Sequence, residues 1–145
     1  MPFTGNFACD VFKTGLMDGA FNFSSTTTQV YKIALYTNAA SLNQDTTAYT
    51  ATGETSGTGY VAGGKVLTIG VNPTNSNDIS YLSFDDITWT GSTFTARGAL
   101  IYKADGVTNP AVCVLDFGSD KTTTNGNFTV QFPSATSTSA VIRIS

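Results

Sequence analysis

The sequence predicts an all-β protein, an antiparallel β-sandwich of jelly-roll type with a short helix or arm at its N-terminus. Short apolar segments with a two-residue alternation recur along the chain. Segments rich in Gly, Pro, Asn, Asp, Ser and Thr separate them, and these residues favour turns. Only 12% of the residues are charged. Because Thr tolerates the half-exposed face of a sheet, this polar but weakly charged composition also favours strands.

A helix is expected only near the start of the chain. In the segment FACDVFKTGLMDGAFNF, Cys9, Phe12 and Leu16 recur three or four positions apart. This spacing places them on one face of a helix, with polar residues between them. We therefore expect a short amphipathic helix over residues 7–18.

The helix suggests a division of the chain into residues 1–22, an arm or short helix, and residues 23–145, a single β-sandwich domain. The arm has two interpretations. It either covers one end of the sheet core or docks on a neighbouring subunit, because its phenylalanines lack room within their own chain. The second interpretation makes them candidate interface residues: Phe3, Phe7 and Phe12. It also predicts that a chain without residues 1–20 stays folded but no longer binds its partner.

Seven segments alternate as strands. They span residues 30–37, 65–71, 81–89, 93–103, 111–117, 127–132 and 140–144. Thr90, Gly91 and Ser92 predict a hairpin turn between the third and fourth. The apolar parity of YLSFDDITW slips at Asp85 and Asp86, which predicts a β-bulge. Residues 38–64 show no clear period, and a loop of this length in a small domain is usually functional or supported by a partner.

The glycine-rich stretch GTGYVAGGK contains two nucleotide-binding signatures. Residues 57–62 match G-x-G-x-x-A, and residues 59–65 match G-x-x-x-x-G-K. Both signatures need a helix after the loop, because the free N–H groups at a helix start bind the phosphate. The following residues 66–71 alternate like a strand, and Val66 stands where a phosphate loop needs Ser or Thr to hold Mg²⁺. We therefore interpret the glycines as turn residues before a strand.

Charge and hydropathy exclude two classes of partner. The net charge is −3 and no run of Lys or Arg occurs, so the electrostatic attraction that dominates nucleic-acid binding is missing. No apolar run approaches the roughly 20 residues needed to span a bilayer, and the N-terminus has no secretory signal pattern. We expect neither a nucleic-acid nor a membrane partner, and synthesis in the cytoplasm.

Residues that usually carry catalysis or bind metals are scarce. The chain has no histidine and two cysteines, Cys9 and Cys113, without a C-x-x-C pair. We expect Cys113 to be buried, and a disulfide between the two stays open as an alternative. Asp85 and Asp86 point to opposite faces of a regular strand, and no pair of carboxylates must converge. We therefore expect no enzymatic activity, no cofactor and no metal.

Several segments together resemble a family of small virion proteins of tailed bacteriophages, many from marine and freshwater hosts. The similarity covers nearly the whole chain, and its most specific parts are YKIALYT, FDDITW, ARGALIY and LDFG, in this order and spacing. The resemblance implies a structural particle protein, a decoration or cement protein on the outside of the head. It brings no catalytic residue with it.

The resemblance also sets the expected partners. They are the major capsid protein and further copies of the chain, most simply in a homotrimer. The contacts are expected from the arm and from the loop over residues 38–64, where the candidate interface residues are Tyr49, Glu54 and Tyr60. The alternatives are a tail, neck or fibre-base protein of the virion, or a carbohydrate-binding β-sandwich whose tyrosines line a sugar platform.

Overall fold

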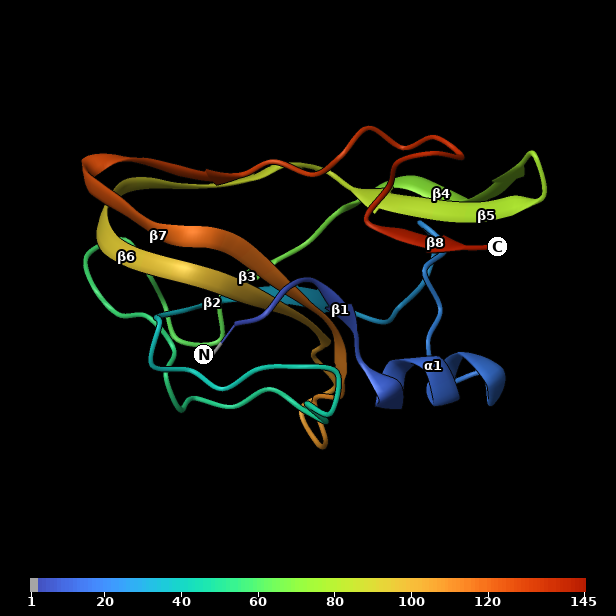
Figure 1. Ribbon diagram of the computed structural model, residues 1–145, viewed down its shortest axis with the longest axis horizontal. Helices are drawn as coiled ribbons and strands as arrows, with labels where there is room; N and C mark the ends of the chain where they lie inside the picture. Colours follow the sequence, from blue (N-terminus) through green and yellow to red (C-terminus); the bar gives the residue numbers. More distant parts are fainter. Residues whose placement is uncertain (1–2) are drawn as a thin grey trace.

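The computed structural model describes residues 3–145, which form an all-β, antiparallel protein with one short helix (Figure 1). The elements are β1 (Phe7–Ala8), α1 (Asp10–Met17), β2 (Tyr31–Tyr36), β3 (Lys65–Val66), β4 (Ile69–Ser76), β5 (Ile79–Phe84), β6 (Ile87–Lys103), β7 (Ala111–Val130) and β8 (Ile142–Ile144). The strands form a large sheet in the order β1-β7-β6-β2-β3 and a small sheet in the order β4-β5-β8. The predicted all-β class is confirmed.

Most of the apolar core lies on the large sheet. Side chains without any exposed surface occur on its strands β2, β6 and β7: Ile33, Leu35, Tyr36, Leu100, Ile101, Val112 and Val114. The buried apolar side chains of the small sheet are Leu82 and Phe84, both on β5. β2 is buried along nearly its whole length, which explains why YKIALY is almost continuously apolar.

The hairpin expected at residues 90–92 is wrong, because β6 runs unbroken across it. Gly91 has a φ of 54°. The register of β6 against β7 shifts between Trp89 and Ser92, but the strand keeps its direction. The Ser92 hydroxyl lies 3.2 Å from the Trp89 carbonyl oxygen and 3.0 Å from that of Gly126. The glycine therefore marks a β-bulge, and the hairpin connection is the segment 104–110 between β6 and β7.

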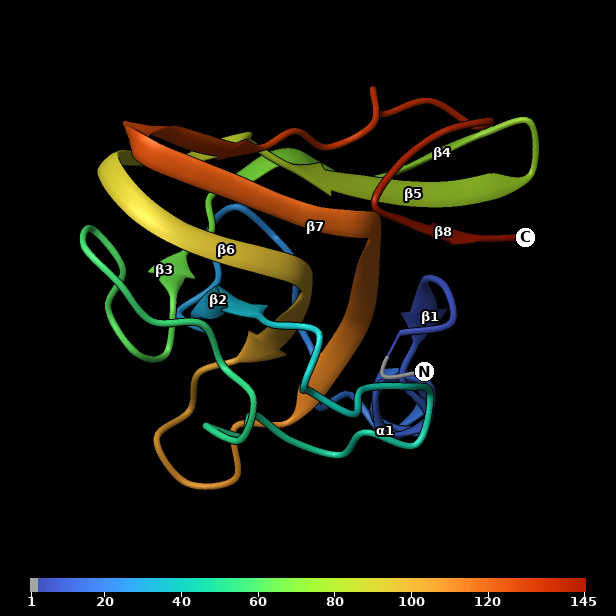
Figure 2. The ribbon, with the colours of Figure 1, turned by 60° about the vertical axis from the view of Figure 1, so that its left-hand side comes forward.

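The segment GSDKTTTNG, residues 118–126, separates the predicted strands 111–117 and 127–132, and its composition favours a turn. The prediction of a turn is wrong, because the whole segment lies inside β7. Hydroxyls of facing threonines approach to 2.8 Å across β6 and β7 in the pairs Thr88–Thr129 and Thr95–Thr122. Two steps along β6, from Gly98 to Ala96, correspond to five along β7, from Asp116 to Lys121. The extra residues of β7 increase the local bend, and the β6–β7 pair curls over on itself (Figures 1 and 2).

Two expected strands, residues 65–71 and 81–89, each divide between the two sheets. The first leaves the large sheet after β3 and enters the small sheet as β4, and the second returns from β5 to β6 at Asp85 and Asp86. The Asp85 N–H donates to the Thr68 carbonyl at 2.9 Å, so the two crossings lie side by side. The β-bulge expected at the aspartates is wrong, because the slip in apolar parity marks a change of sheet.

The predicted helix is confirmed, although it is shorter than residues 7–18. Residues Phe7 and Ala8 pair with Val114 and Cys113 as β1, and α1 follows. The helix buries Phe12, whose ring packs edge-to-face against Phe21 with centroids 5.1 Å apart. The N-terminal segment is thereby attached both to the edge of the large sheet and to the aromatic core.

The phenylalanines expected to lack room within the chain are placed inside it. Phe3 and Phe12 are each 2% exposed, while Phe7 is half-buried. The expected crowding is therefore wrong for Phe3 and Phe12. Deletion of residues 1–20 would remove both rings from the core. The structure therefore contradicts the premise, an arm outside the core, on which we expected the shortened chain to stay folded.

Candidate functional site

The long loop, residues 37–64, carries three of the predicted interface residues, and the structure brings these three together. The Tyr49 hydroxyl donates to Glu54 Oε2 at 2.6 Å, and the Tyr60 hydroxyl donates to Oε1 at 2.6 Å. The Gly63 N–H donates to the same Oε1 at 2.7 Å. Glu54, the only glutamate of the chain, thus joins three separate points of the loop.

Two tyrosines of the large sheet attach the loop to the core. The Tyr36 hydroxyl of β2 donates to the Thr50 carbonyl at 2.7 Å, and the Tyr102 hydroxyl of β6 donates to the Gly63 carbonyl at 2.7 Å. The Tyr102 ring also stacks on Tyr49, with centroids 4.9 Å apart. These side chains form what we call the Glu54 cluster: Tyr36, Tyr49, Glu54, Tyr60 and Tyr102.

The backbone of the loop extends the edge of the large sheet. Thr55 N–H donates to the Leu35 carbonyl and Thr37 N–H donates to the Gly53 carbonyl, both at 2.9 Å. The Leu35 N–H in turn donates to the Tyr60 hydroxyl at 2.9 Å. The loop therefore covers the part of β2 that β3 leaves unpaired, which blunts an exposed strand edge.

The environment keeps the tyrosines of the cluster protonated. Burial, followed by the hydrogen bond to Glu54, raises the pKa of both Tyr49 and Tyr60 well above the ordinary value. Burial and then the Glu54 charge raise the pKa of Tyr102 to about 12. Neither ion pair among residues 3–145 includes Glu54. Its carboxylate is held by charge-assisted hydrogen bonds from neutral donors, an arrangement suited to a structural joint.

The glycines of the nucleotide-binding signatures serve the turn that ends the loop. Gly63 and Gly64 have φ values of 90° and 77°, and a Cβ on Gly64 would collide with the Ile33 carbonyl. The strand β3 follows directly, so the prediction of a strand in place of a helix is confirmed. Lys65 Nζ donates to the Thr88 carbonyl at 2.6 Å, which holds the lysine against β6.

The loop and β3 expose an apolar surface that the sequence analysis missed. Val61 is 74% exposed and Val66 is 56% exposed, and Ala62 beside them is also exposed. We call these three residues the loop surface. The sequence did contain a signal for this surface, namely apolar residues within a glycine-rich turn. The alternation of residues 66–71 placed Val66 on one face of a strand but did not show that this face is exposed.

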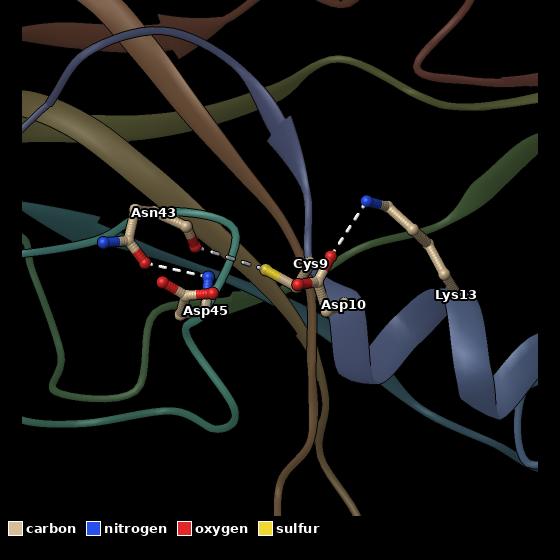
Figure 3. Close-up of polar contacts among 5 residues, drawn as sticks. All are labelled: Cys9, Asp10, Lys13, Asn43 and Asp45. Atoms are coloured by element: carbon tan, nitrogen blue, oxygen red, sulfur yellow. Dashed lines mark hydrogen bonds and ion pairs between the residues drawn. The ribbon is translucent and has the colours of Figure 1, made fainter.

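Cys9 connects the start of α1 to the same loop (Figure 3). Its thiol donates to the Asn43 carbonyl at 3.9 Å, and the Asp10 N–H donates to the Gln44 carbonyl at 2.9 Å. Burial, and secondarily the Asp10 charge, raises the pKa of the Cys9 thiol to about 11. Cys113 is buried as predicted, and both thiols are free. The raised pKa makes Cys9 a poor nucleophile at neutral pH.

Three further carboxylates have separate structural roles. Asp86 accepts the Phe132 N–H at 2.9 Å, and Asp116 forms an ion pair with Arg97. Asp105 accepts the N–H groups of the turn between β6 and β7. Across residues 3–145, no three His, Cys, Asp or Glu side chains are grouped so that they could hold a metal ion.

The six predicted interface residues therefore fall into two groups. Tyr49, Glu54 and Tyr60 meet in the loop. The phenylalanines lie in the N-terminal segment, where Phe3 contacts Gly98 of β6 and its ring lies 5.9 Å from the Arg97 guanidinium. Contact of these six residues with a partner protein stays a prediction.

Comparison with known proteins gives no relative for this chain: no family model, no curated protein and no solved structure matches it. In the part of the chain that the structure describes, no helix combines the length and apolar character needed to cross a membrane.

Proposed function

We propose that this chain is a structural protein of a tailed-bacteriophage particle, most simply a decoration or cement protein on the outer surface of the head. The observation that carries the proposal is the loop surface, in which Val61 and Val66 stand exposed at the end of a loop held by the Glu54 cluster. The resemblance of segments such as YKIALYT and FDDITW to phage virion proteins supports the same role.

A cement protein benefits from a contact surface that is rigid before binding. Ordering a flexible loop costs free energy at the moment of association. Here three hydrogen bonds to Glu54 and the Tyr102 bond to Gly63 hold the loop in place within the free chain. An exposed apolar patch on such a support is typical of a protein–protein contact.

The finer architecture belongs to this proposal as well. We take the two sheets as the layers of a jelly-roll-like β-sandwich, whose strands change sheets at the adjacent crossings near Thr68 and Asp85. Strands that switch between packed sheets through bends are known from such folds. The sandwich would support the loop surface on one side and leave the small sheet free on another.

Weak contacts suffice for this role, because a head offers many identical sites. A protein that binds only the assembled shell stabilises it by mass action, and bridging contacts add through their effective concentration. The net charge of −3 disfavours contact with packed DNA and favours the outside of the shell. The partners in this proposal are the major capsid protein and further copies of the chain.

The first test measures binding of the purified protein to phage shells assembled without it. A double substitution, Val61→Glu with Val66→Glu, should weaken binding at least about tenfold, because loss of a contact hot spot costs more than about 1 kcal/mol per residue. The matched control is Val107→Glu, which changes a valine that is 86% exposed elsewhere on the surface. Equal binding by all three proteins would reject the loop surface as the contact.

A second test separates a decoration protein from the other particle roles. Quantification of the protein in purified particles should give hundreds of copies, as a head lattice demands. About a dozen copies would instead indicate the neck, tail or fibre base. Absence from particles together with binding on a glycan array would favour the carbohydrate-binding alternative.

A further inference from the structure

The end of β7 and the strand β8 follow one another along the same side of the chain that forms β5 and β6. Val130 of β7 pairs with Ile87, and Ile142 of β8 pairs with Leu82. The partner positions thus descend along the β5–β6 chain as β7 gives way to β8, and β4 lies on the other side of β5. We call residues 127–131 together with β8 the open edge.

The backbone of the open edge has no partner on its outer side. β1 pairs with β7 only at Cys113 and Val114, and β8 is the last strand of its sheet. Within residues 3–145, the open edge forms no backbone–backbone hydrogen bond beyond its pairing with β5 and β6. Because alternate residues of a strand direct their N–H and C=O groups away from the paired neighbour, the open edge presents free donors and acceptors.

The other strand edges are protected, which sets the open edge apart. In the first half of β7, the Asp116 N–H donates to Asn6 Oδ1 at 2.7 Å and the Gly118 N–H donates to Asp116 Oδ1 at 2.8 Å. The loop covers β2, and β4 carries Pro73, which has no N–H. Devices of this kind prevent a strand edge from pairing with other chains. The open edge has neither a side-chain cap nor a proline.

A groove runs beside the open edge. It consists of three adjoining hollows with volumes of about 420, 420 and 240 Å³. Phe117 and Val130 line the first two hollows, and Leu115 and Val141 line the last two. The third hollow is also lined by residues of β1 and β8, which lie close together in both views (Figures 1 and 2). We call these hollows the edge groove.

The unpaired charges of the edge groove are both positive. Lys121 lines the hollow at one end and Arg143 lines the hollow at the other, and neither takes part in an ion pair within residues 3–145. The third charged residue of the groove, Asp116, is paired with Arg97. The groove is therefore apolar in its middle and complementary to an acidic group at each end.

We infer that an extended segment of another protein adds to the open edge as a further strand. The backbone of this segment pairs with the free N–H and C=O groups, and every second side chain is apolar and enters the edge groove. Acidic residues at the ends of the segment meet Lys121 and Arg143. The unpaired backbone identifies the occupant as an extended chain, and the lining identifies its side chains.

The charges favour a different protein over a second copy of this chain. Two copies joined through their open edges would bring the same basic side chains together, and like charges on facing strands repel. The edge groove would also stay unfilled, because each copy would contribute only its edge. The inference does not depend on the particle role, since β7 and the loop surface lie toward opposite edges of the large sheet.

The first experiment uses a fluorescein-labelled peptide in which Thr and Val alternate between terminal Asp residues. Its anisotropy should show saturable binding to the unchanged protein below about 1 mM. Two further peptides carry N-methyl groups, one on the threonine nitrogens and the other on the valine nitrogens. Only one of them should bind at least about tenfold more weakly, because one set of N–H groups faces the open edge. Equal affinity of all three peptides, or no binding of the first, would overturn the inference.

Amide hydrogen exchange measured by NMR locates the bound peptide. Exchange of outward-facing amides in residues 127–131 and in β8 should slow at least about tenfold when the peptide is bound, because they gain acceptors. Protection confined to other strands would overturn the inference. Protection of the same amides without peptide, together with self-association in analytical ultracentrifugation, would overturn the assignment to another protein in favour of a second copy.

A substitution in the edge groove tests the side-chain contact. Val141→Glu puts a carboxylate at a position that lines two of the hollows, and it should weaken peptide binding at least about tenfold. The control Val107→Glu, in the exposed turn between β6 and β7, should bind as the unchanged protein does. Equal binding by both variants, with circular dichroism of a folded chain, would overturn the groove contact. If Val141→Glu does not fold, the N-methyl peptides decide with the unchanged protein. Shell binding through the loop surface is measured separately, so failure here leaves the particle role standing.

Discussion

The large and small sheets differ in how completely their strands are buried. In the large sheet, Ile33, Leu100 and Val112 have no exposed surface. In the small sheet, β4 and β8 contain no buried residue. The difference follows the strand sequences, because the buried β2 is almost continuously apolar (YKIALY) while the exposed β4 (IGVNPTNS) is rich in Asn, Thr and Ser.

The coverage of the two sheets has identifiable causes. The loop over residues 37–64 pairs with the part of β2 that β3 leaves unpaired, and Cys9, just before α1, ties this loop to the N-terminal segment. The small sheet ends in β4, an edge strand that contains Pro73. Proline removes a backbone donor and is typical of a strand edge that faces away from partner strands. Most of the fully buried side chains therefore lie on the large sheet, and the small sheet is the more exposed of the two.

The largest effect should follow from removing residues 1–20. This deletion takes Phe3, Cys9 and Phe12 out of the core, where each is at most 2% exposed. Losses of 2–5 kcal/mol per large core side chain would together consume a total stability of about 5–15 kcal/mol. We expect no cooperative urea transition, followed by circular dichroism.

The matched control for this deletion is a chain that ends at residue 140, which lacks β8 of the small sheet. It should unfold cooperatively at a lower urea concentration than the full chain. Cooperative unfolding of the N-terminal deletion would contradict the assignment of these side chains to the core.

A pair of point substitutions compares the two sheets directly. Leu100→Ala on β6 should lower the free energy of unfolding by about 2–5 kcal/mol, because it leaves a cavity at a fully buried position. Ile142→Ala on β8, which is half-buried, should cost about 1 kcal/mol. Urea denaturation of both proteins measures the difference, and equal losses would remove the distinction between the sheets.

The Glu54 cluster gives the next smaller effect. Glu54→Gln keeps the shape of the side chain but puts an amide N–H₂ where one tyrosine hydroxyl donates, so a donor in the half-buried site loses its acceptor. The expected loss is about 1–3 kcal/mol. Asp45→Asn, an exposed acid in the same loop, should change stability by less than about 0.5 kcal/mol. Similar losses in both variants would mean that the cluster does not hold the loop.

The smallest effect concerns the turn between β6 and β7. The backbone N–H groups of Asn109 and Val107 lower the pKa of Asp105 from 3.8 to about 2. A carboxylate with a lowered pKa in the folded state contributes stability that is complete above 3.8 and lost as the pH falls to 2. Carboxyl NMR titration measures the value directly, and a midpoint near 4 would show that the turn is open in solution.

Much of the fold could be predicted because it follows from local patterns. The alternation of residues 30–37 predicted β2, and the three- to four-residue spacing of Cys9, Phe12 and Leu16 predicted α1. The strand after Gly64 likewise excluded the helix that a phosphate loop needs. In these cases the side-chain period is set by backbone geometry within a few residues, so no distant contact is needed.

The sequence by itself thus determined the all-β class, the helix and most strand segments, while tertiary contacts decided how they join. A glycine within a strand favours a turn and a bulge alike, and at Gly91 the register against Gly126 selected the bulge. At Asp85 the slip in apolar parity corresponds to a change of sheet, and the neighbouring chain also changes sheets there, at Thr68, whose carbonyl accepts the Asp85 N–H. The site depended on tertiary structure even more, since the sequence marked Glu54 as the only glutamate but only the folded loop places two tyrosine hydroxyls on its carboxylate.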